Sequence, residues 1–328
     1  MTLLSVKDLT VSITRADGTT APVIEGVSFD LAPAEVMGLV GESGCGKSVT
    51  ASAIMGVLPP SMKITGGTIH LGKQEMTALP ERRLRELRGR EIAMVFQDPM
   101  SSLNPLIPVG RQIAETLIIH GTSRREAKAR ALELLKLVRI PSPELRMAEY
   151  PHRMSGGMRQ RVMIAVALAC NPKVLICDEP TTALDVTIQR QILNLLQDLQ
   201  RDLGIAVLMI THDFGVVREF AHQVTVMYAG RVVEQARCES LFSHPAHPYS
   251  QKLLAAMPHF SREELGPRRV KLVEIPGFVP PIGQRPAGCT FAPRCAVASE
   301  VCRQTAPPLE AWRQSHLAAC YHKGGHLV

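Results

Sequence analysis

The sequence contains no apolar run long enough to cross a membrane as a helix, which takes roughly 18 residues or more. Its longest apolar stretches, 162–170 and 205–210, have the lengths of a buried helix and a buried strand. The N-terminal residues also lack the basic segment followed by an apolar one that marks a secretion signal. Because both features are missing, we expect the chain to work in the cytosol.

Concentrated positive charge is missing as well. The net charge is +7, but the basic residues are scattered along the chain. Pairs such as Arg82–Arg83 and Arg124–Arg125 are typical of solvated helix faces. Binding to DNA or RNA requires a clustered basic surface, so we expect no nucleic-acid partner.

Closely spaced cysteine pairs are absent too, although the chain has eight cysteines. Four are isolated: Cys45, Cys170, Cys177 and Cys238. The other four gather near the C-terminal end: Cys289, Cys295, Cys302 and Cys320. A reducing cytosol disfavours disulfides, so this quartet predicts a metal site. Structural zinc usually uses C-x-x-C-like pairs, whereas gaps of 5, 6 and 17 residues are compatible with a [4Fe–4S] cluster held by four thiolates. Zinc and unligated thiols remain the alternatives.

Periodicity in the apolar residues divides the chain into strands and helices. Strand patterns cover residues 3–13, 23–31, 35–40, 69–71, 91–96, 174–177, 205–210 and 224–228. Helical patterns cover residues 49–57, 109–120, 124–138, 158–169 and 188–202. Strands and helices alternate on either side of about 99–160, and helices fill that interval. This order predicts an α/β fold in which a mainly parallel sheet carries a helical subdomain.

Beyond about Pro258 prolines and glycines become dense, as in Pro276–Gly277 and Pro280–Pro281, and regular patterns fade. Small domains with so little apolar periodicity commonly need a metal or a similar staple. We therefore predict an α/β domain at 1–255 and a small irregular C-terminal extension at 256–328, which contains the cysteine quartet.

Residues 41–48 read Gly-Glu-Ser-Gly-Cys-Gly-Lys-Ser and fit the pattern G-x-x-x-x-G-K-[ST]. Glycines let the backbone wrap a phosphate, so that N–H groups and the following helix start face the anion. Lys47 would neutralise the β- and γ-phosphates, and the Ser48 hydroxyl would bind Mg²⁺. A chance glycine-rich turn is a weak alternative, because an apolar strand precedes the loop and a helix follows it. The expected nucleotide contacts are Gly41, Ser43, Gly44, Cys45, Gly46, Lys47, Ser48 and Val49.

Two adjacent acids, Asp178 and Glu179, follow the apolar residues 174–177. A carboxylate at the end of such a strand is the usual holder of Mg²⁺, directly or through water. The second carboxylate projects differently and can polarise an attacking water as a general base. A solvated turn is disfavoured, because four apolar residues precede the pair and Pro180 follows it.

Gln97 and His212 stand at the ends of two further predicted strands. The neutral amide of Gln97 is suited to contact Mg²⁺ or the water and to report the nucleotide state to a partner. His212 ends the next apolar strand after Asp178, where an imidazole can sense the γ-phosphate. A lone glutamine says almost nothing and a lone histidine is usually structural, so both assignments depend on the surrounding motifs.

Ser155, Gly156 and Gly157 open another helix. A serine hydroxyl, backbone N–H groups and the helix dipole suit an anion, although an ordinary N-cap serine would explain the residues in isolation. The phosphate loop already holds the nucleotide from one side. A second anion-binding helix start, separated from it by the helical insert, is better placed to serve the ATP of another subunit.

In this order the motifs resemble those of the ATP-binding-cassette (ABC) ATPases over residues 3 to about 255. The matching motifs are 41–48, Gln97, Ser155–Gly157, Asp178–Glu179, Ala183–Asp185 and His212. The resemblance implies a P-loop core, an antiparallel N-terminal β region and the helical subdomain, with ATP and Mg²⁺ as cofactors. It places Lys47, Gln97, Glu179 and His212 in catalysis. It places Ser48, Gln97 and Asp178 at the Mg²⁺ ion.

Two positions depart from the family pattern. The signature runs from Met154 to Met158, whereas the commonest form begins with leucine and ends with glutamine; peptide-importer members often end with methionine. The family also often stacks adenine on an aromatic residue near the end of the first strand. Residues 11–14 contain none, so Ile13 offers apolar packing only.

The C-terminal part narrows the resemblance. Residues 244–249, His-Pro-Ala-His-Pro-Tyr, and 288–295, Gly-Cys-Thr-Phe-Ala-Pro-Arg-Cys, are similar to the tail of ATPases that serve oligopeptide and dipeptide importers, a subfamily understood to carry a [4Fe–4S] cluster. The resemblance implies a peripheral ATPase on the cytoplasmic face of the bacterial inner membrane that powers peptide import. Its implied partners are a second, paralogous ATPase subunit, two membrane permease subunits and, indirectly, a substrate-binding protein.

Two other functions remain open. An ABC ATPase of translation or DNA repair would keep the ATP site, but translation types normally carry two cassettes in one chain and repair types a long coiled coil. This sequence has neither pattern. Alternatively, the cysteine tail would make the chain a redox-sensing regulatory subunit.

Overall fold

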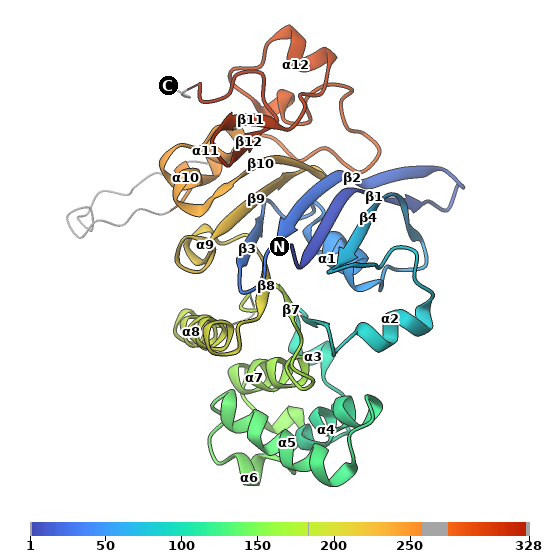
Figure 1. Cartoon of the computed structure of the whole chain (residues 1–328). Coiled ribbons are helices and arrows are strands. Elements are labelled where there is room, and N and C mark those ends of the chain that lie inside the picture. Colours follow the sequence, from blue (N-terminus) through green and yellow to red (C-terminus); the bar gives the residue numbers. More distant parts are fainter. Residues whose placement is uncertain (1, 183, 258–274, 326–328) are drawn as a thin grey trace, which may run out of the picture.

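The computed structural model describes residues 2–182, 184–257 and 275–325 (Figure 1). Two sheets share one hydrophobic core, with a helical subdomain at one end of the molecule and the C-terminal extension at the other. Within these ranges no helix is both long and apolar enough to cross a membrane. Ala183, named above among the motifs, and residues 258–274 of the predicted extension lie outside the described residues.

The smaller sheet is built from the N-terminal part of the chain. It consists of β1 (Leu4–Thr14), β2 (Thr20–Leu31), β4 (Met62–Leu71) and β5 (Gln74–Glu75), in the order β2-β1-β4-β5 with antiparallel pairing throughout. Apolar side chains of β1 and β2 are buried against the main sheet, while many of their neighbours in sequence are exposed, as expected for a sheet with one buried face. The implied antiparallel N-terminal region is therefore confirmed.

The larger sheet has the order β11-β12-β10-β9-β3-β8-β7-β6. Five neighbouring strands, up to the β6 edge, are parallel and almost wholly buried: β9 (Gln223–Tyr228), β3 (Val36–Val40), β8 (Ala206–Thr211), β7 (Val174–Asp178) and β6 (Ile92–Val95). Burial on both faces explains why these strands read as continuous apolar runs. Parallel strands end at the same edge, so the segments that follow β3, β6, β7 and β8 meet there.

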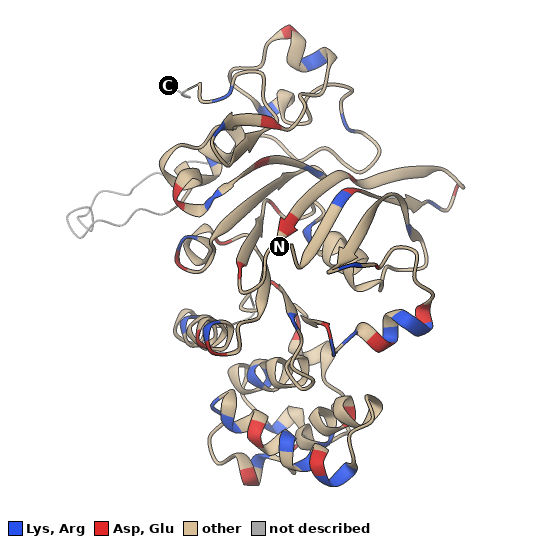
Figure 2. Ribbon diagram, viewed as in Figure 1, with Lys and Arg blue, Asp and Glu red and all other residues tan. Residues whose placement is uncertain are grey.

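Four helices outside the helical subdomain follow strands of the two sheets: α1 (Lys47–Met55), α2 (Glu81–Leu87), α8 (Val186–Leu203) and α9 (Phe214–Phe220). Acidic and basic residues are interspersed on α2 and in the helical subdomain (Figure 2). On α2 they form ion pairs at helical spacing, including Arg85 with Glu81 at 3.0 Å and Arg83 with Glu86. The predicted α/β fold with a mainly parallel sheet is confirmed.

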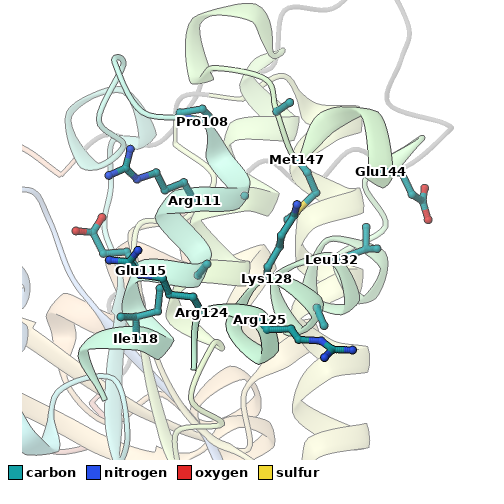
Figure 3. Close-up of a pocket in the computed structure, with 14 residues that line it drawn as sticks. Pro108, Arg111, Glu115, Ile118, Arg124, Arg125, Lys128, Leu132, Glu144 and Met147 are labelled. Carbon is teal, nitrogen blue, oxygen red and sulfur yellow. The ribbon is translucent and has the colours of Figure 1, made fainter. Parts of the chain in front are cut away.

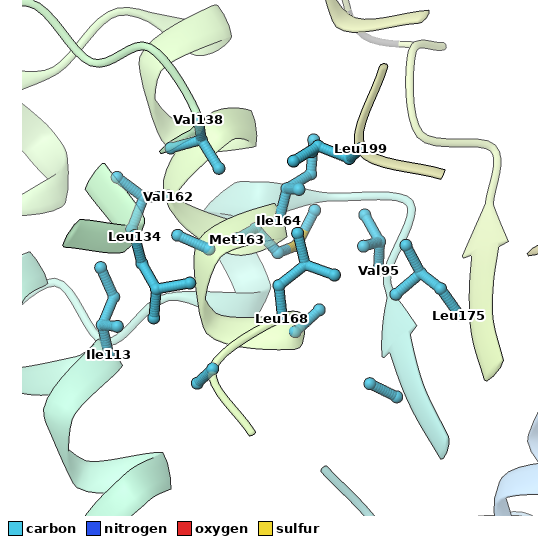
Figure 4. Packing of buried hydrophobic residues seen from close by; sticks show 14 of the residues in the cluster. Val95, Ile113, Leu134, Val138, Val162, Met163, Ile164, Leu168, Leu175 and Leu199 are labelled. Atoms are coloured by element: carbon cyan, nitrogen blue, oxygen red, sulfur yellow. The ribbon is translucent and has the colours of Figure 1, made fainter. Parts of the chain in front are cut away.

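The helical subdomain fills the interval between β6 and β7. It contains α3 (Pro99–Ser102), α4 (Val109–Ile119), α5 (Arg124–Leu137), α6 (Pro143–Arg146), the short 3₁₀ turn η1 (Pro151–Arg153) and α7 (Gly156–Ala167). Helix α5 starts at a capping box in which Ser123 and Glu126 bond reciprocally. Apolar side chains of α4, α5 and α7, such as Ile113, Leu134 and Val162, pack together and continue into the strands through Val95 (Figure 4).

The C-terminal extension joins the main sheet. The α/β domain ends with β10 (Arg231–Arg237), α10 (Cys238–Ser243) and α11 (Pro248–Ala255), and the extension itself contains η2 (Ala292–Arg294), α12 (Glu300–Gln304), β11 (Glu310–Arg313) and β12 (His316–Ala318). Strand β12 pairs with β10, and β11 pairs with β12. The fully buried His316 and Glu234 side chains lie 2.7 Å apart across the first pair. Sequence periodicity missed β11 and β12, because four and three residues are too few to show alternation.

Candidate nucleotide site

The loop between β3 and α1 carries the phosphate-binding pattern. Two of its glycines leave no room for a side chain: a Cβ on Gly41 would lie 2.2 Å from the Met227 carbonyl oxygen, and one on Gly46 would lie 2.4 Å from Ile24 Cγ2. Their φ angles of 150° and 103° are also ones that glycine adopts most readily. The loop therefore packs closely against β2 and β9 directly before the N-terminus of α1, where phosphate binds favourably.

Lys47 supplies the positive charge of this loop. It is the first residue of α1 and only 5% exposed. Its Nζ donates hydrogen bonds to the carbonyl oxygens of Gly41, at 2.7 Å, and Glu42, at 3.1 Å. The ammonium group is thus held against the loop at the start of the helix. This is the position in which the sequence pattern predicts a positive charge for the phosphates.

The other loop residues surround this charge. Ser43 and Gly44 are exposed and Val49 is half-buried. Cys45 is fully buried, and burial raises the pKa of its thiol. A protonated, buried thiol is inert, so Cys45 contributes packing rather than a reactive group.

Ser48 and Asp178 meet as the sequence predicted for a Mg²⁺ site. The Ser48 hydroxyl donates a hydrogen bond to Asp178 Oδ1 at 3.0 Å. Burial raises the pKa of Asp178, and the hydrogen bond from Ser48 opposes that shift. A hydroxyl and a carboxylate side by side are oxygen donors of the kind that Mg²⁺ prefers, so the residues present fit the ion.

Glu179 is the centre of the second group. Its carboxylate accepts hydrogen bonds from Gln97 Nε2 at 3.2 Å and from the Thr182 hydroxyl at 2.9 Å, and it lies 3.3 Å from His212 Nδ1. Its φ of 46° is unusual for a residue with a side chain, and such backbone strain concentrates at functional sites. The structure therefore brings together three residues predicted from separate strands. Thr182 is the member that the sequence analysis missed, although it lies within the motif after β7.

Ser155, Gly156 and Gly157 lie at the start of α7. The Ser155 hydroxyl accepts a hydrogen bond from the Met158 N–H at 3.3 Å, as an N-cap does. A Cβ on Gly157 would lie 2.6 Å from Ile188 Cγ2, so α7 approaches α8 closely there. Asp185 caps α8 through the Ile188 N–H at 3.0 Å. Within the described ranges, no hydrogen bond joins Ser155 to the phosphate loop.

The four clustered cysteines converge in the extension. Cys289, Cys295, Cys302 and Cys320 line one cavity of about 10 Å³ together with Phe291 and His247. Burial raises the pKa of Cys320 to about 11 and also raises the pKa of Cys289 and Cys295. The convergence fits four thiol donors for a soft metal. Yet within the described ranges no three His, Cys, Asp or Glu side chains are placed to hold a metal ion, so the structure as it stands does not support the predicted cluster or zinc site.

A larger cavity of about 1030 Å³ opens in the helical subdomain (Figure 3). It lies between α4, α5 and α6. Its wall mixes apolar residues such as Ile118, Leu132 and Met147 with charged ones such as Arg111 and Lys128. Arg124 and Arg125 also line this cavity, although their sequence pattern indicated only a solvated helix face. A cavity between two amphipathic helices leaves no periodic signal in the sequence.

Comparison with known protein families gives two matches. Residues 24–182 match the family model described as "ABC transporter", and residues 233–302 match "Oligopeptide/dipeptide transporter, C-terminal region". Both matches agree with the motifs from which the resemblance was inferred. The first spans the phosphate loop and the acids after β7, and the second includes three of the four clustered cysteines.

Curated relatives match over nearly their full length. A probable peptide ABC transporter ATP-binding protein of Sinorhizobium fredii is 52% identical over 97% of this chain and 94% of its own. The oligopeptide transport ATP-binding protein OppD of Salmonella typhimurium is 48% identical over 97% of this chain and 93% of its own. Among solved structures, the dimeric post-hydrolysis state of the ATP-binding cassette MJ0796 bound to ADP and Pi has a TM-score of 0.64 at 28% identity, covering 72% of this chain and 98% of that one.

Proposed function

The chain belongs to the ATP-hydrolysing, ATP-binding subunits of ABC transporters, and from this premise we propose that it powers the import of di- or oligopeptides through a membrane transporter. The match of the C-terminal part to oligopeptide and dipeptide transporters supports the cargo class, as do the names of the relatives. The observation that carries the catalytic part is the meeting of Gln97, Glu179 and His212 at one edge of the sheet, next to Ser48 and Asp178.

One group of residues binds the nucleotide and Mg²⁺, and the group around Glu179 carries out hydrolysis. The loop 41–48 and Lys47 bind the phosphates, with Gly44, Cys45 and Val49 forming the adjoining wall. Ser48 and Asp178 hold Mg²⁺, which offsets charge on the phosphoryl group when it is bound. Gln97 contacts Glu179 in this structure; we assign it a contact to the metal or the water as well.

Glu179 accepts a proton from the attacking water. Its carboxylate is 14% exposed, and hydrogen bonds from Gln97 and Thr182 fix its position. A fixed general base next to the phosphate site orients the water in line with the phosphoryl group. His212, which is half exposed, is placed on the other carboxylate oxygen to contact the γ-phosphate.

A second ATPase subunit completes the site. The start of α7, with Ser155, Gly156 and Gly157, presents a hydroxyl and a helix N-terminus that, in the described part of the chain, form no hydrogen bond to the phosphate loop. The dimeric arrangement of the MJ0796 cassette supports a partner in that position. We assign the partner to a paralogous subunit, so that each start of α7 faces the other subunit's ATP.

Two permease subunits and, indirectly, a substrate-binding protein are the remaining partners, and they place the chain on the cytoplasmic face of the inner membrane. Gln97 is two residues from α3, so it links the ATP site directly to the helical subdomain. The cavity between α4, α5 and α6 offers apolar and charged side chains on the same subdomain. We therefore assign the permease contact to this region.

The four thiols of the extension are assigned to a [4Fe–4S] cluster, with Zn²⁺ as the alternative. Their convergence on one cavity supports a shared ligand. Because that cavity is only about 10 Å³, the four side chains would have to move apart to hold four irons. Iron, sulfide and zinc analysis of anaerobically purified protein distinguishes the cluster from the zinc site. Zinc without iron would show that the cluster assignment is wrong.

The test of the proposed function is reconstitution. The chain is purified from membranes with its copurifying proteins, placed in vesicles, and assayed for peptide uptake and ATP hydrolysis. Peptide-dependent hydrolysis and uptake are expected. Hydrolysis that responds to nucleic acid but not to peptide would instead favour the translation or repair alternative, which the comparisons do not support. A reversible response to oxidation without transport would favour the redox-sensing alternative, which they also do not support.

A further inference from the structure

The C-terminal extension reaches into the phosphate loop through a buried arginine. We propose that Arg294 neutralises the loop's one acidic residue, Glu42, and thereby raises the affinity for the nucleotide's phosphates. This inference rests on the proposed ATP site and adds a positioning residue to it from outside the cassette motifs.

The pair is close and bidentate. Arg294 Nη1 donates to Glu42 Oε2 at 2.7 Å, and Nη2 donates to Glu42 Oε1 at 3.0 Å. The arginine side chain is 4% exposed, whereas that of Glu42 is 27% exposed. Paired hydrogen bonds between a guanidinium and a carboxylate are among the strongest polar contacts in proteins.

The remaining N–H groups of the Arg294 guanidinium also donate hydrogen bonds. Its Nε donates to the Pro276 carbonyl at 2.9 Å, Nη2 donates to the Ile275 carbonyl at 3.0 Å, and Nη1 donates to the Tyr228 hydroxyl at 3.3 Å. With the two bonds to Glu42, all five N–H groups of the arginine have acceptors. The arginine is therefore held in one orientation, with its charge directed at Glu42.

A second contact holds the backbone of the same residue. The Glu42 N–H donates to the Tyr249 hydroxyl at 2.8 Å. Tyr249 is fully buried, and its ring lies 4.7 Å from that of Tyr228 and 5.3 Å from that of Phe291. Phe291 directly precedes the turn that carries Arg294. Glu42 is thus held by Tyr249 of this aromatic cluster and by Arg294, which lies over the Tyr228 ring, and both residues belong to the region that matches the peptide-transporter tail.

The charge balance of the loop gives this pair a consequence for binding. Among residues 41–48 Glu42 is the acid and Lys47 the base, and Lys47 Nζ contacts the Glu42 carbonyl at 3.1 Å. An unpaired carboxylate at this position would repel the polyphosphate at short range. With Arg294 in place the loop and its buried partner carry net positive charge, which favours an anion.

Other contacts also anchor the extension to the core. His316 and Glu234 already join β12 to β10. Arg285, whose side chain is 10% exposed, donates to the Val23 carbonyl and pairs with Glu25 at 3.4 Å, on β2 rather than on the phosphate loop. Arg285 is therefore a matched control: a buried arginine of the same extension that contacts the core elsewhere.

The experiment measures nucleotide affinity by calorimetry with the full-length chain. Arg294→Met should weaken ATP binding by about tenfold, the size of one lost charged contact. The loss should shrink from ATP to ADP to AMP as phosphates are removed. Arg285→Met should bind ATP as the wild type does. Glu42→Gln in the Arg294→Met background should restore affinity to within about threefold of the wild type, because the repelling charge is gone.

Several outcomes would overturn the inference. Equal ATP affinity in wild type and Arg294→Met would do so, as would a loss that is the same for ATP and AMP and that Glu42→Gln does not restore. If Arg294→Met does not fold, Arg294→Lys, which keeps the charge, must bind more tightly than Arg294→Gln. A wild-type chain that binds no ATP at all would count against the proposed function instead.

Discussion

The phosphate loop and the start of α7 are both helix N-termini suited to an anion, but the chain supports them very differently. Contacts from β2, β9 and the extension hold the loop, and the contact between Glu42 and Arg294 joins residues 252 positions apart. The start of α7 has a local cap at Ser155 and packing against Ile188. We call the phosphate loop the finished half of the proposed site, because contacts within the chain hold it, and the start of α7 the open half, because we assign it to the nucleotide of a partner subunit.

The largest expected effect tests the general base in the finished half. Glu179→Gln keeps the shape and the hydrogen bonds at this position but cannot take the proton of the attacking water. ATP hydrolysis should fall by at least about 100-fold, the usual contribution of a general base. ATP affinity should stay within about threefold of the wild type, because the phosphate loop is untouched. Single-turnover hydrolysis and equilibrium binding measure the two quantities. A variant that still hydrolyses ATP at the native rate would remove Glu179 from its role.

Sequence reasoning predicted side chains that the structure brings together where a motif directly follows a buried parallel strand. Asp178, Glu179 and His212 could be placed because each ends a run of apolar residues in a parallel strand, and parallel strands end at one edge. Gln97 and Glu179 are in contact for the same reason.

The contacts of the extension could not be predicted from the sequence. A pair such as Arg294 and Glu42 leaves no periodic signal, and β11 and β12 are too short to show one. The convergence of the four cysteines was implied by their clustering, but whether they hold a metal depends on side-chain placement that spacing does not determine.

Acid should destabilise the C-terminal contacts that support the finished half. Burial lowers the pKa of His247 to about 4, and the neutral ring caps α11 by accepting from the Tyr249 N–H at 3.0 Å. A base with a lowered pKa in the fold contributes stability that is complete above pH 6.5 and declines as the pH falls toward 4. The free energy of unfolding should therefore drop by about 2 kcal/mol from this group between pH 7 and pH 5.

His247→Asn tests this source of acid sensitivity. Asparagine keeps an acceptor for the cap but does not titrate. Urea denaturation at the two pH values should show a loss that is smaller in the variant by about 2 kcal/mol. The same loss in both proteins would assign the acid sensitivity to other groups. The start of α7 should be unaffected, because the contacts of His247 with Glu234, Tyr249 and the cysteine cavity lie in the C-terminal part of the chain.

A smaller effect should appear in the open half. Ser155→Ala removes a hydroxyl that caps α7 and, in the assembled transporter, would contact the partner's nucleotide. ATP affinity of the isolated chain should not change. Hydrolysis by the assembled transporter should fall by about tenfold, as expected for one lost hydrogen bond to a charged group. Reduced ATP affinity in the isolated chain would mean that Ser155 serves its own nucleotide, and the contrast between the two halves would be wrong.

The smallest expected effect concerns stability within the finished half. Burial raises the pKa of Asp178, so its ionised form opposes folding at neutral pH. Asp178→Asn keeps an oxygen that can accept from the Ser48 hydroxyl but removes the charge. Without nucleotide or metal, the variant should therefore unfold at a slightly higher Tm than the wild type. Mg²⁺ and ATP together should then raise its Tm less than that of the wild type, because a ligand of the ion is lost. A lower Tm in the ligand-free variant would show that the carboxylate stabilises the site even when it is empty, and that the chain, not the ion, satisfies its charge.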